Sequence, residues 1–251
     1  MSSIPLRLRY YDFVSPEPLP LTEEYGRYLE LEWEVPVEQV GLVVVDGWNS
    51  HYLADTQARN EQVIHTKLAP LIAACRRAGL AVIHAPSEPV TSKYLGRPVP
   101  PAPPARPWPP EDFIHRRGAY ASYRRPAGPR HQEVRRQASS DRDFHPALRP
   151  LAGEAVIGSR DELREVLHRE GLLFLLYAGF HNNACILQRE FGLWDMRREG
   201  YECILVRDAV TGMESAQTRH TLEQTAQATL MVEMMGGSSV ATAALMSALD
   251  S

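Results

Sequence analysis

The sequence predicts an α/β protein in which a doubly wound, mostly parallel sheet of about six strands lies between two layers of helices. Short apolar runs rich in β-branched residues alternate with helix-like segments along most of the 251-residue chain, and this alternation is typical of repeated βα units. Several of the runs end in polar residues, as strands do where a ligand site forms at the carboxyl edge of a parallel sheet. These observations indicate a three-layer α/β/α, Rossmann-like architecture, to which the N-terminal residues add a β arm.

Residues 1–36 are the predicted β arm. Polar and apolar side chains alternate in LRLRYYDF and again in YLELEWEV, with the turn-forming stretch SPEPLPL between them. Alternation with a period of two indicates half-buried strands, so we expect a hairpin here. The main domain is then expected over residues 37–251.

The predicted elements of the main domain follow in strand and helix order. GLVVVD (41–46) is typical of a strand buried on both faces, and a helix around 60–78 and the strand LAVIHA (80–85) complete a right-handed unit. After a long interruption, strands and helices are expected alternately at 154–158, 161–169, 172–179, 183–199, 201–209 and 216–235. SSVAT can add a last strand before a C-terminal helix.

Residues 87–150 interrupt this order with a different composition. GRPVPPAPPARPWPP has eight prolines in fifteen residues, so we expect a stiff, partly polyproline excursion there. The stretch that follows is rich in arginine and tyrosine and includes Arg117 and Tyr120. It can act as a lid that clamps a substrate carboxylate. A solvated charge run and a subunit contact are the simpler interpretations.

Composition excludes several classes of function. The net charge of −4 gives no global reason to expect nucleic acid or an acidic membrane as partner. Three cysteines without paired spacing argue against a disulfide framework and a structural zinc site, and they favour a cytoplasmic location. No dinucleotide or phosphate-loop motif occurs, and no apolar run approaches the ~20 residues that span a bilayer. We therefore expect no cofactor, no nucleic acid and no membrane.

Two residues at predicted strand ends are candidates for chemistry. Cys185, in GFHNNACIL, lies near the start of a predicted helix, where backbone N–H groups lower the pKa of a thiol and can bind an oxyanion. Asp46 follows the first buried strand, and burial there would raise its pKa and let it accept the thiol proton. The alternatives are a buried structural thiol and a helix-capping or turn-forming carboxylate.

The motifs around these residues resemble a known superfamily. GLVVVDGWNSH, AGFHNNACILQREFGLWDMRREGYECILVRDAVTG and RHTLEQTAQATL are similar to segments of the isochorismatase-like cysteine hydrolases, which include nicotinamidases and N-carbamoylsarcosine amidohydrolases. The resemblance covers roughly Val37–Leu249 apart from the Pro/Arg-rich middle. Its most specific part is the pattern G-x-x-N-N-x-C from Gly179 to Cys185.

In that superfamily an Asp–Lys–Cys triad cleaves the substrate. The resemblance implies that Asp46 is the general acid and base, and that Cys185 attacks an amide carbonyl and forms a thioester. It also implies a cis peptide near Phe180–His181, an oxyanion hole made by the backbone N–H groups of Ala184 and Cys185, and a homo-oligomer.

The lysine of the triad is where the sequence departs from the superfamily. It normally follows the strand that corresponds to EAVIG, yet the chain there reads GSRDELREVL, and its only lysines are Lys67 and Lys93. Lys93, just beyond the second strand, is the candidate for the triad, with an exposed loop lysine as the alternative. Arg160 could replace it by position, although a guanidinium keeps its proton. A site without a cation is the third interpretation.

Nicotinamidase-like members bind a divalent ion through an Asp-x-His pair and a further histidine. That pair is missing here, so we expect no metal, and we interpret His51 and His84 as hydrogen-bonded or pocket-lining residues. Trp48 can form an aromatic wall for a flat substrate. The expected substrate contacts are Trp48, His51, His181, Asn182, Arg117 and Tyr120.

These inferences predict a cysteine hydrolase that cleaves a linear amide or carbamoyl-type C–N bond of a small molecule, which can carry a carboxylate. Hydrolysis of a vinyl ether, as in isochorismatase, is an alternative on the same fold, but it uses no thiol nucleophile. A binding or assembly protein that keeps the fold without the chemistry is the other alternative.

Overall fold

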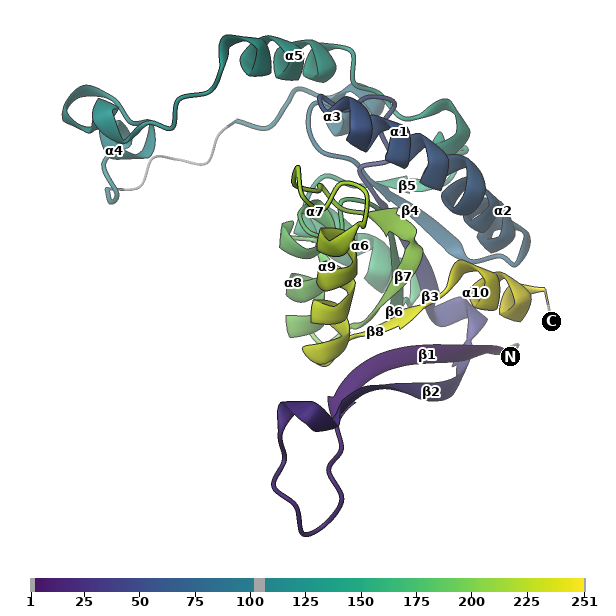
Figure 1. The fold of residues 1–251 in the computed structure, drawn as a ribbon. Helices are drawn as coiled ribbons and strands as arrows, with labels where there is room; N and C mark the ends of the chain where they lie inside the picture. The colour runs from purple at the N-terminus through teal and green to yellow at the C-terminus, as the bar shows by residue number, and fades with distance from the viewer. Residues whose placement is uncertain (1–2, 102–106, 251) are drawn as a thin grey trace.

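The computed structural model describes residues 3–101 and 107–250, which contain an eight-stranded sheet (Figure 1). The strands lie in the order β2-β1-β8-β7-β6-β3-β4-β5. Neighbours from β8 to β5 are parallel, whereas β1 pairs antiparallel with β2 and β8. The predicted doubly wound fold with an N-terminal hairpin is confirmed. The strands are β1 Ser3–Phe13, β2 Gly26–Pro36, β3 Val40–Val45, β4 Ala81–Ala85, β5 Ala155–Val156, β6 Phe174–Phe180, β7 Glu202–Thr211 and β8 Ser238–Val240.

Helices cover both faces of the sheet (Figure 1). α2 and α10 pack into one hydrophobic cluster, and α6, α8 and α9 pack into a second cluster on the opposite face. None of the helices within the described ranges is long and apolar enough to cross a membrane. The helices are α1 Ala54–Val63, which continues through the π-helical turn Ile64–Leu68 into α2 Ala69–Arg77, then α3 Val90–Leu95, α4 Glu111–Ile114, α5 Pro129–Ser140, α6 Arg160–Glu170, α7 Cys185–Gln188, α8 Leu193–Arg198, α9 Glu223–Met234 and α10 Thr242–Leu249.

The winding of the sheet reverses between β3 and β6. The chain moves outward from β3 to β4 and β5, returns to β6 on the other side of β3, and continues to β7 and β8. Gly179 permits β6 to approach β3, because a Cβ atom there would lie 2.1 Å from the carbonyl oxygen of Val45, and its φ of +106° favours glycine. In open α/β sheets, ligands bind in the crevice at the carboxyl ends of such a pair of strands.

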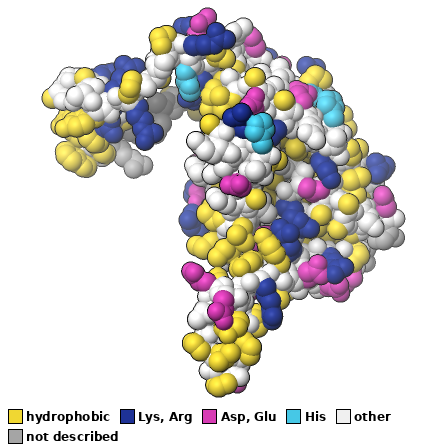
Figure 2. Space-filling model, viewed as in Figure 1, with side chains coloured by type: hydrophobic (Ala, Val, Ile, Leu, Met, Phe, Trp, Pro, Cys, Tyr) yellow, Lys and Arg dark blue, Asp and Glu magenta, His cyan; other side chains and the backbone are white. Residues whose placement is uncertain are grey.

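The N-terminal hairpin is part of the core at its base and exposed at its tip. Ile4, Leu6 and Leu8 alternate with exposed residues on β1 and are buried, and Arg9 forms an ion pair with the buried Glu233 of α9 (Nε to Oε1, 2.8 Å). The tip projects from the body, and hydrophobic side chains gather on it (Figure 2). β1 shares a buried hydrophobic cluster with the main sheet, so the hairpin has no separate core. The division of the chain at residue 37 stays a prediction.

The excursion over residues 87–150 contains more regular structure than its prolines predict. α3 and α5 lie within it, and a short lobe around α4 projects away from the sheet (Figure 1). Exposed apolar and arginine side chains share the surface of this lobe (Figure 2). Residues 102–106 of the expected polyproline stretch lie outside the described residues.

Three helices differ from their predicted extents. The helix expected around 60–78 begins earlier, at Ala54. The helix expected over 183–199 is divided into α7 and α8, because the backbone becomes extended at Arg189 and then turns tightly at Gly192, where a Cβ atom would lie 2.8 Å from the carbonyl oxygen of Arg189. The helix expected from residue 216 begins at Glu223. The Glu214 carboxylate accepts the N–H groups of Gln224 (3.1 Å) and Thr225 (2.9 Å), which satisfies backbone donors of the first turn.

Candidate active site

Asp46 and Cys185 meet where the winding of the sheet reverses. Asp46 follows β3 directly, and Cys185 begins α7 shortly after β6, the hydrogen-bonded neighbour of β3. The thiol and the carboxylate are close enough for each to shift the pKa of the other, although Asp46 Oδ2 has no hydrogen-bond partner among the described residues. The structure thus brings the two predicted catalytic residues into one site.

The Asp46 carboxylate is enclosed, with an exposed fraction of 2% for the residue. Its Oδ1 accepts hydrogen bonds from the backbone N–H and the hydroxyl of Ser87, both at 2.8 Å. Burial raises the pKa of Asp46, while the Cys185 thiol, the charge of Arg189 and the Ser87 hydrogen bonds oppose this rise. Its φ of +48° is left-handed, a strained backbone that costs about 1–3 kcal/mol for a residue other than glycine. Such strain persists only where the surrounding structure fixes it, as at an active site.

The Cys185 thiol is half-buried, and its pKa is raised to about 12. Burial disfavours the thiolate, the Asp46 carboxylate repels it, and the charge of Arg189 compensates only in part. The expected lowering of this pKa is therefore wrong. α7 is a single turn, and burial together with the Asp46 charge opposes any lowering of the pKa by its N-terminal N–H groups. The resting site holds a protonated thiol that faces a carboxylate able to accept its proton.

Arg189 supplies the positive charge of the site. Its Nη2 lies 3.7 Å from Cys185 Sγ and 3.8 Å from Asp46 Oδ2, and it also donates to Ser87 Oγ. Cys185 and Arg189 are four residues apart across α7, a spacing that places two side chains on the same helical face. This spacing is visible in the sequence and could have identified Arg189 as the cation, but the sequence-based candidates were a lysine and Arg160.

Lys93 and Arg160, the sequence-based candidates for this cation, lie elsewhere. Lys93 Nζ forms an ion pair with Asp143 Oδ2 (2.9 Å), and its side chain is 63% exposed. Arg160 donates to the carbonyl oxygen of Glu190 and to Asp195, both at 2.8 Å. The assignment of Lys93 to the triad is corrected. Lys93 lies on α3, and its ammonium group pairs with Asp143 near the end of the excursion and not with Asp46 or Cys185.

The loop before Cys185 contains the expected cis peptide between Phe180 and His181. A carbonyl oxygen of this loop also occupies one of the two N–H groups expected in the oxyanion hole. The N–H of Ala184 donates to the carbonyl oxygen of His181 (3.0 Å) and so cannot also bind an oxyanion, contrary to expectation. Over the described ranges no acceptor faces the N–H of Cys185, which leaves it as the backbone donor next to the thiol.

Three of the expected substrate contacts lie around this centre. The His51 and His181 rings pack edge to face at 5.0 Å, and Trp48 follows Asp46 by two residues. Burial lowers the pKa of His51 to about 4 and that of His181 to about 3, so both imidazoles are neutral at pH 7. Trp48 Nε1 and His181 Nε2 are buried and have no hydrogen-bond partner within residues 3–101 and 107–250. They are available to a bound molecule.

The other three expected contacts are elsewhere. Asn182 is fully buried, and its Nδ2 donates to the Thr225 carbonyl oxygen (2.9 Å) and to Thr229 Oγ1 (3.2 Å), so it fastens the cysteine loop to α9. Tyr120 packs against Phe113 at 5.2 Å in the lobe around α4, and Arg117 lies in the same lobe, which projects away from the sheet (Figure 1). A substrate lid built from Arg117 and Tyr120 is not present in this arrangement.

Glu61, His65 and His145 form a cluster with the composition of a metal site, their potential ligand atoms lying within 4.8 Å of one another. His145 Nδ1 accepts the N–H of Ala147 (3.2 Å), which leaves the ring proton on Nε2, directed at Glu61 Oε2 (3.2 Å). A metal would need that nitrogen unprotonated. The cluster therefore fits a hydrogen-bonded tether between α1 and the end of the excursion.

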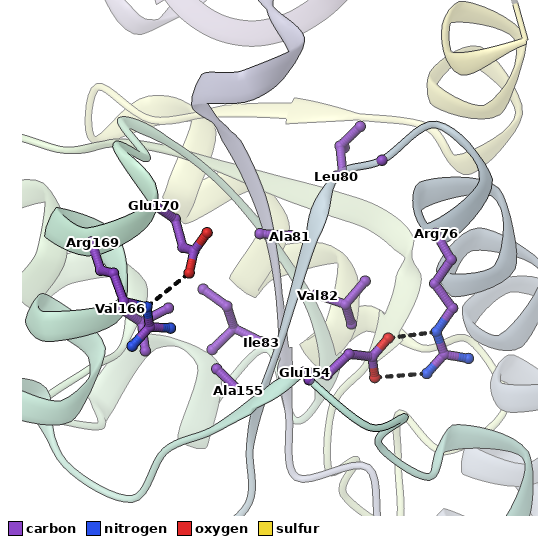
Figure 3. A pocket seen from close by; sticks show the side chains of 12 residues that line it. Arg76, Leu80, Ala81, Val82, Ile83, Glu154, Ala155, Val166, Arg169 and Glu170 are labelled. Carbon is purple, nitrogen blue, oxygen red and sulfur yellow. Dashed lines mark hydrogen bonds and ion pairs between the residues drawn. The ribbon is translucent and has the colours of Figure 1, made fainter.

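His84 lies away from Cys185, in an ion-pair network at the outer strands of the sheet. Its Nε2 lies 2.8 Å from Glu154 Oε2, and Glu154 also forms two hydrogen bonds with Arg76 (2.7 and 2.9 Å), beside a cavity of about 290 Å3 (Figure 3). Burial would raise the pKa of Glu154, but the hydrogen bonds from Arg76, the Leu151 N–H and His84 lower it to about 2. This network is structural.

We expect Glu154→Gln to lower the free energy of unfolding by about 2 kcal/mol at pH 7, because one pKa unit corresponds to ~1.4 kcal/mol and solvent reduces the full value. A depressed carboxyl pKa stabilises the fold above the unfolded-state pKa. The difference between wild type and variant should therefore be complete above about pH 4.5 and shrink as the pH falls toward 2. Urea unfolding across this range measures it. Glu170→Gln, on the same cavity, is the control and should change stability by less than about 0.5 kcal/mol. A difference that does not vary with pH would contradict the assignment.

Comparison with known proteins agrees with this architecture. The model of the isochorismatase domain family matches residues 40–235, so the chain belongs to that family, within the isochorismatase-like cysteine hydrolase superfamily. No curated protein matches the sequence.

Among solved structures, the chain is similar to a cysteine hydrolase from Pseudomonas syringae pv. phaseolicola, with 15% identity, a TM-score of 0.58, and coverage of 87% of this chain and 95% of that one. It is also similar to an isochorismatase family protein from Burkholderia thailandensis, with 18% identity, a TM-score of 0.52, and coverage of 85% and 97%. At such identities the likeness shows the fold alone.

Proposed function

We propose that the protein is a cysteine hydrolase that cleaves a linear amide or carbamoyl-type C–N bond of a small molecule. The observation that carries this proposal is the position of Arg189, whose Nη2 lies 3.7 Å from Cys185 Sγ and 3.8 Å from Asp46 Oδ2. A nucleophile, a proton acceptor and a fixed cation are thereby within reach of one reacting carbonyl.

The proposed reaction begins with transfer of the Cys185 proton to Asp46 as sulfur attacks the carbonyl carbon. The N–H of Cys185 binds the developing oxyanion. Collapse of the tetrahedral species breaks the C–N bond, and Asp46 returns the proton to the departing ammonia or amine. Water, deprotonated by Asp46, then attacks the thioester and releases the acid with the thiol restored.

The chemical role of Arg189 differs from that of the lysine in an Asp–Lys–Cys triad. A guanidinium does not lose its proton at any working pH, so Arg189 cannot carry protons and acts only through its fixed charge. That charge favours the thiolate during attack and the Asp46 carboxylate before it. Ser87, held between Arg189 and Asp46, keeps the carboxylate oriented.

A thiol at this position favours acyl transfer over vinyl-ether hydrolysis, which needs an acid but no nucleophile.

The test is to let hydroxylamine compete with water for the thioester, so that the acyl group is divided between hydroxamate and acid. A primary amide and its N-methylamide with the same acyl group should give the same ratio of hydroxamate to acid, because both pass through one thioester on Cys185. Unequal ratios, or hydrolysis without hydroxamate, would exclude the shared intermediate.

A further inference from the structure

Four arginines lie near the catalytic pair or the adjacent His51 ring. Arg189 contacts both catalytic groups directly, and the charges of Arg59, Arg135 and Arg142 act on the adjacent His51 ring. In the part of the chain that the structure describes, none of these last three arginines forms an ion pair. Within the described residues, no ion pair neutralises these three positive charges beside the site.

Arg142 is the best placed of the four to hold a ligand. Its guanidinium carbon lies 3.7 Å from the centre of the Trp48 ring, and its Nε is buried without a hydrogen-bond partner among the described residues. Burial lowers its pKa, whereas Asp46 and the ionised form of Cys185 raise it, so the group lies within electrostatic reach of both. A buried guanidinium N–H without an acceptor costs free energy that a hydrogen bond to an anionic ligand would recover.

The backbone fixes this position. Trp48 forms an antiparallel bridge with Phe144, and Asn49 and Asp143 exchange two hydrogen bonds of 3.0 and 2.9 Å. The end of the excursion is thus paired with the loop that follows Asp46. Arg142 directly precedes the paired residues of this connection, while the lobe around α4 projects away from the sheet (Figure 1).

The rings beside Arg142 and Trp48 carry no negative charge. The His51 and His181 imidazoles are neutral at pH 7, and Arg135 packs over the Tyr52 ring at 5.0 Å. His181 is 5% exposed, and its Nε2 lacks a partner over the described ranges. An anion entering here would meet cations, aromatic faces and neutral imidazoles.

We propose that the substrate carries a carboxylate in addition to its scissile C–N bond, and that Arg142 binds this carboxylate through two N–H groups while Trp48 supports the guanidinium plane. The inference rests on the proposed function, because it needs Cys185 to be the reacting group. A planar guanidinium edge matches the two oxygens of a carboxylate.

Iodoacetate and iodoacetamide test this without a known substrate, because they differ only in a carboxylate and a carboxamide. The ratio of their alkylation rates at Cys185, followed by peptide mass mapping, cancels the thiolate fraction, which is common to both reagents. We expect the iodoacetate-to-iodoacetamide ratio of the wild type to exceed that of Arg142→Gln by at least about tenfold. Arg136→Gln, an exposed arginine of α5, is the matched control and should keep the wild-type ratio.

Equal ratios in wild type and Arg142→Gln would overturn the inference. Protection of Cys185 by succinate is expected to exceed protection by inorganic phosphate at equal concentration, and the reverse order would overturn the choice of a carboxylate. The absolute reactivity of Cys185 bears on the proposed function instead. Both rates are measured at alkaline pH, because the pKa of Cys185 is raised to about 12. A Cys185 that stays inert to both reagents there would contradict the nucleophile, whereas a reactive Cys185 without preference would contradict only the role of Arg142.

Discussion

Cys185→Ala is expected to abolish hydrolysis of amide and N-carbamoyl substrates, with a loss in kcat of at least about 10⁴-fold. Cys185 is the nucleophile of the proposed mechanism, whereas Ser87 Oγ donates to Asp46 and accepts from Arg189 and so serves to orient them. Ammonia release under saturating substrate measures the loss, and circular dichroism should show that the fold is retained.

Cys75→Ala is the matched control, because it makes the same chemical change at a thiol that is fully buried on α2. It should lose stability by a cavity effect while turnover per folded molecule stays near that of the wild type. Residual turnover of Cys185→Ala above about 1% of wild type would contradict covalent catalysis.

Arg189→Met is expected to lower kcat/KM by about 10²-fold or more, because it removes the one cation in contact with both the carboxylate and the sulfur. The dependence of its kcat/KM on pH distinguishes an effect through Asp46 from other effects. The charge of Arg189 opposes the burial that raises the pKa of Asp46, so its loss raises that pKa further. Asp46 then becomes a free base only at higher pH, and the acid limb of kcat/KM should move upward.

Arg189→Lys keeps the charge and should restore part of the rate and the position of the acid limb. Arg160→Met, which removes an arginine paired with Asp195, is the control and should leave the profile unchanged. If Arg189→Met lowers the rate without moving the acid limb, Arg189 acts on Cys185 or substrate and not through Asp46.

The sequence predicted the sheet and the two central residues for one physical reason. Buried parallel strands are short apolar runs, so their ends can be located to within a residue or two, and strand ends are where a doubly wound sheet forms its site. Asp46 and Cys185 were found in this way. The helix over 183–199 was predicted as continuous because α7 and α8 have compatible apolar patterns on both sides of Gly192.

The cation and the substrate contacts could be predicted less well. Arg189 was readable from its spacing to Cys185, but Arg142 was not, because its contact with Trp48 depends on the return path of an excursion whose course no periodicity encodes. Lys93 was misassigned for the same reason, since its partner Asp143 lies on that return path.

The unpaired arginines also bear on what happens after bond cleavage. Hydrolysis of an amide converts a neutral group into a second carboxylate, so the product would carry one more negative charge than the substrate that entered. Opposite charges at about 4 Å attract by several kcal/mol where the effective dielectric constant is near 20. If the proposed amide hydrolysis and the proposed carboxylate site both hold, the same guanidinium groups would hold the acid product more tightly than the substrate. We would then expect departure of the acid to limit turnover and added salt to accelerate that step.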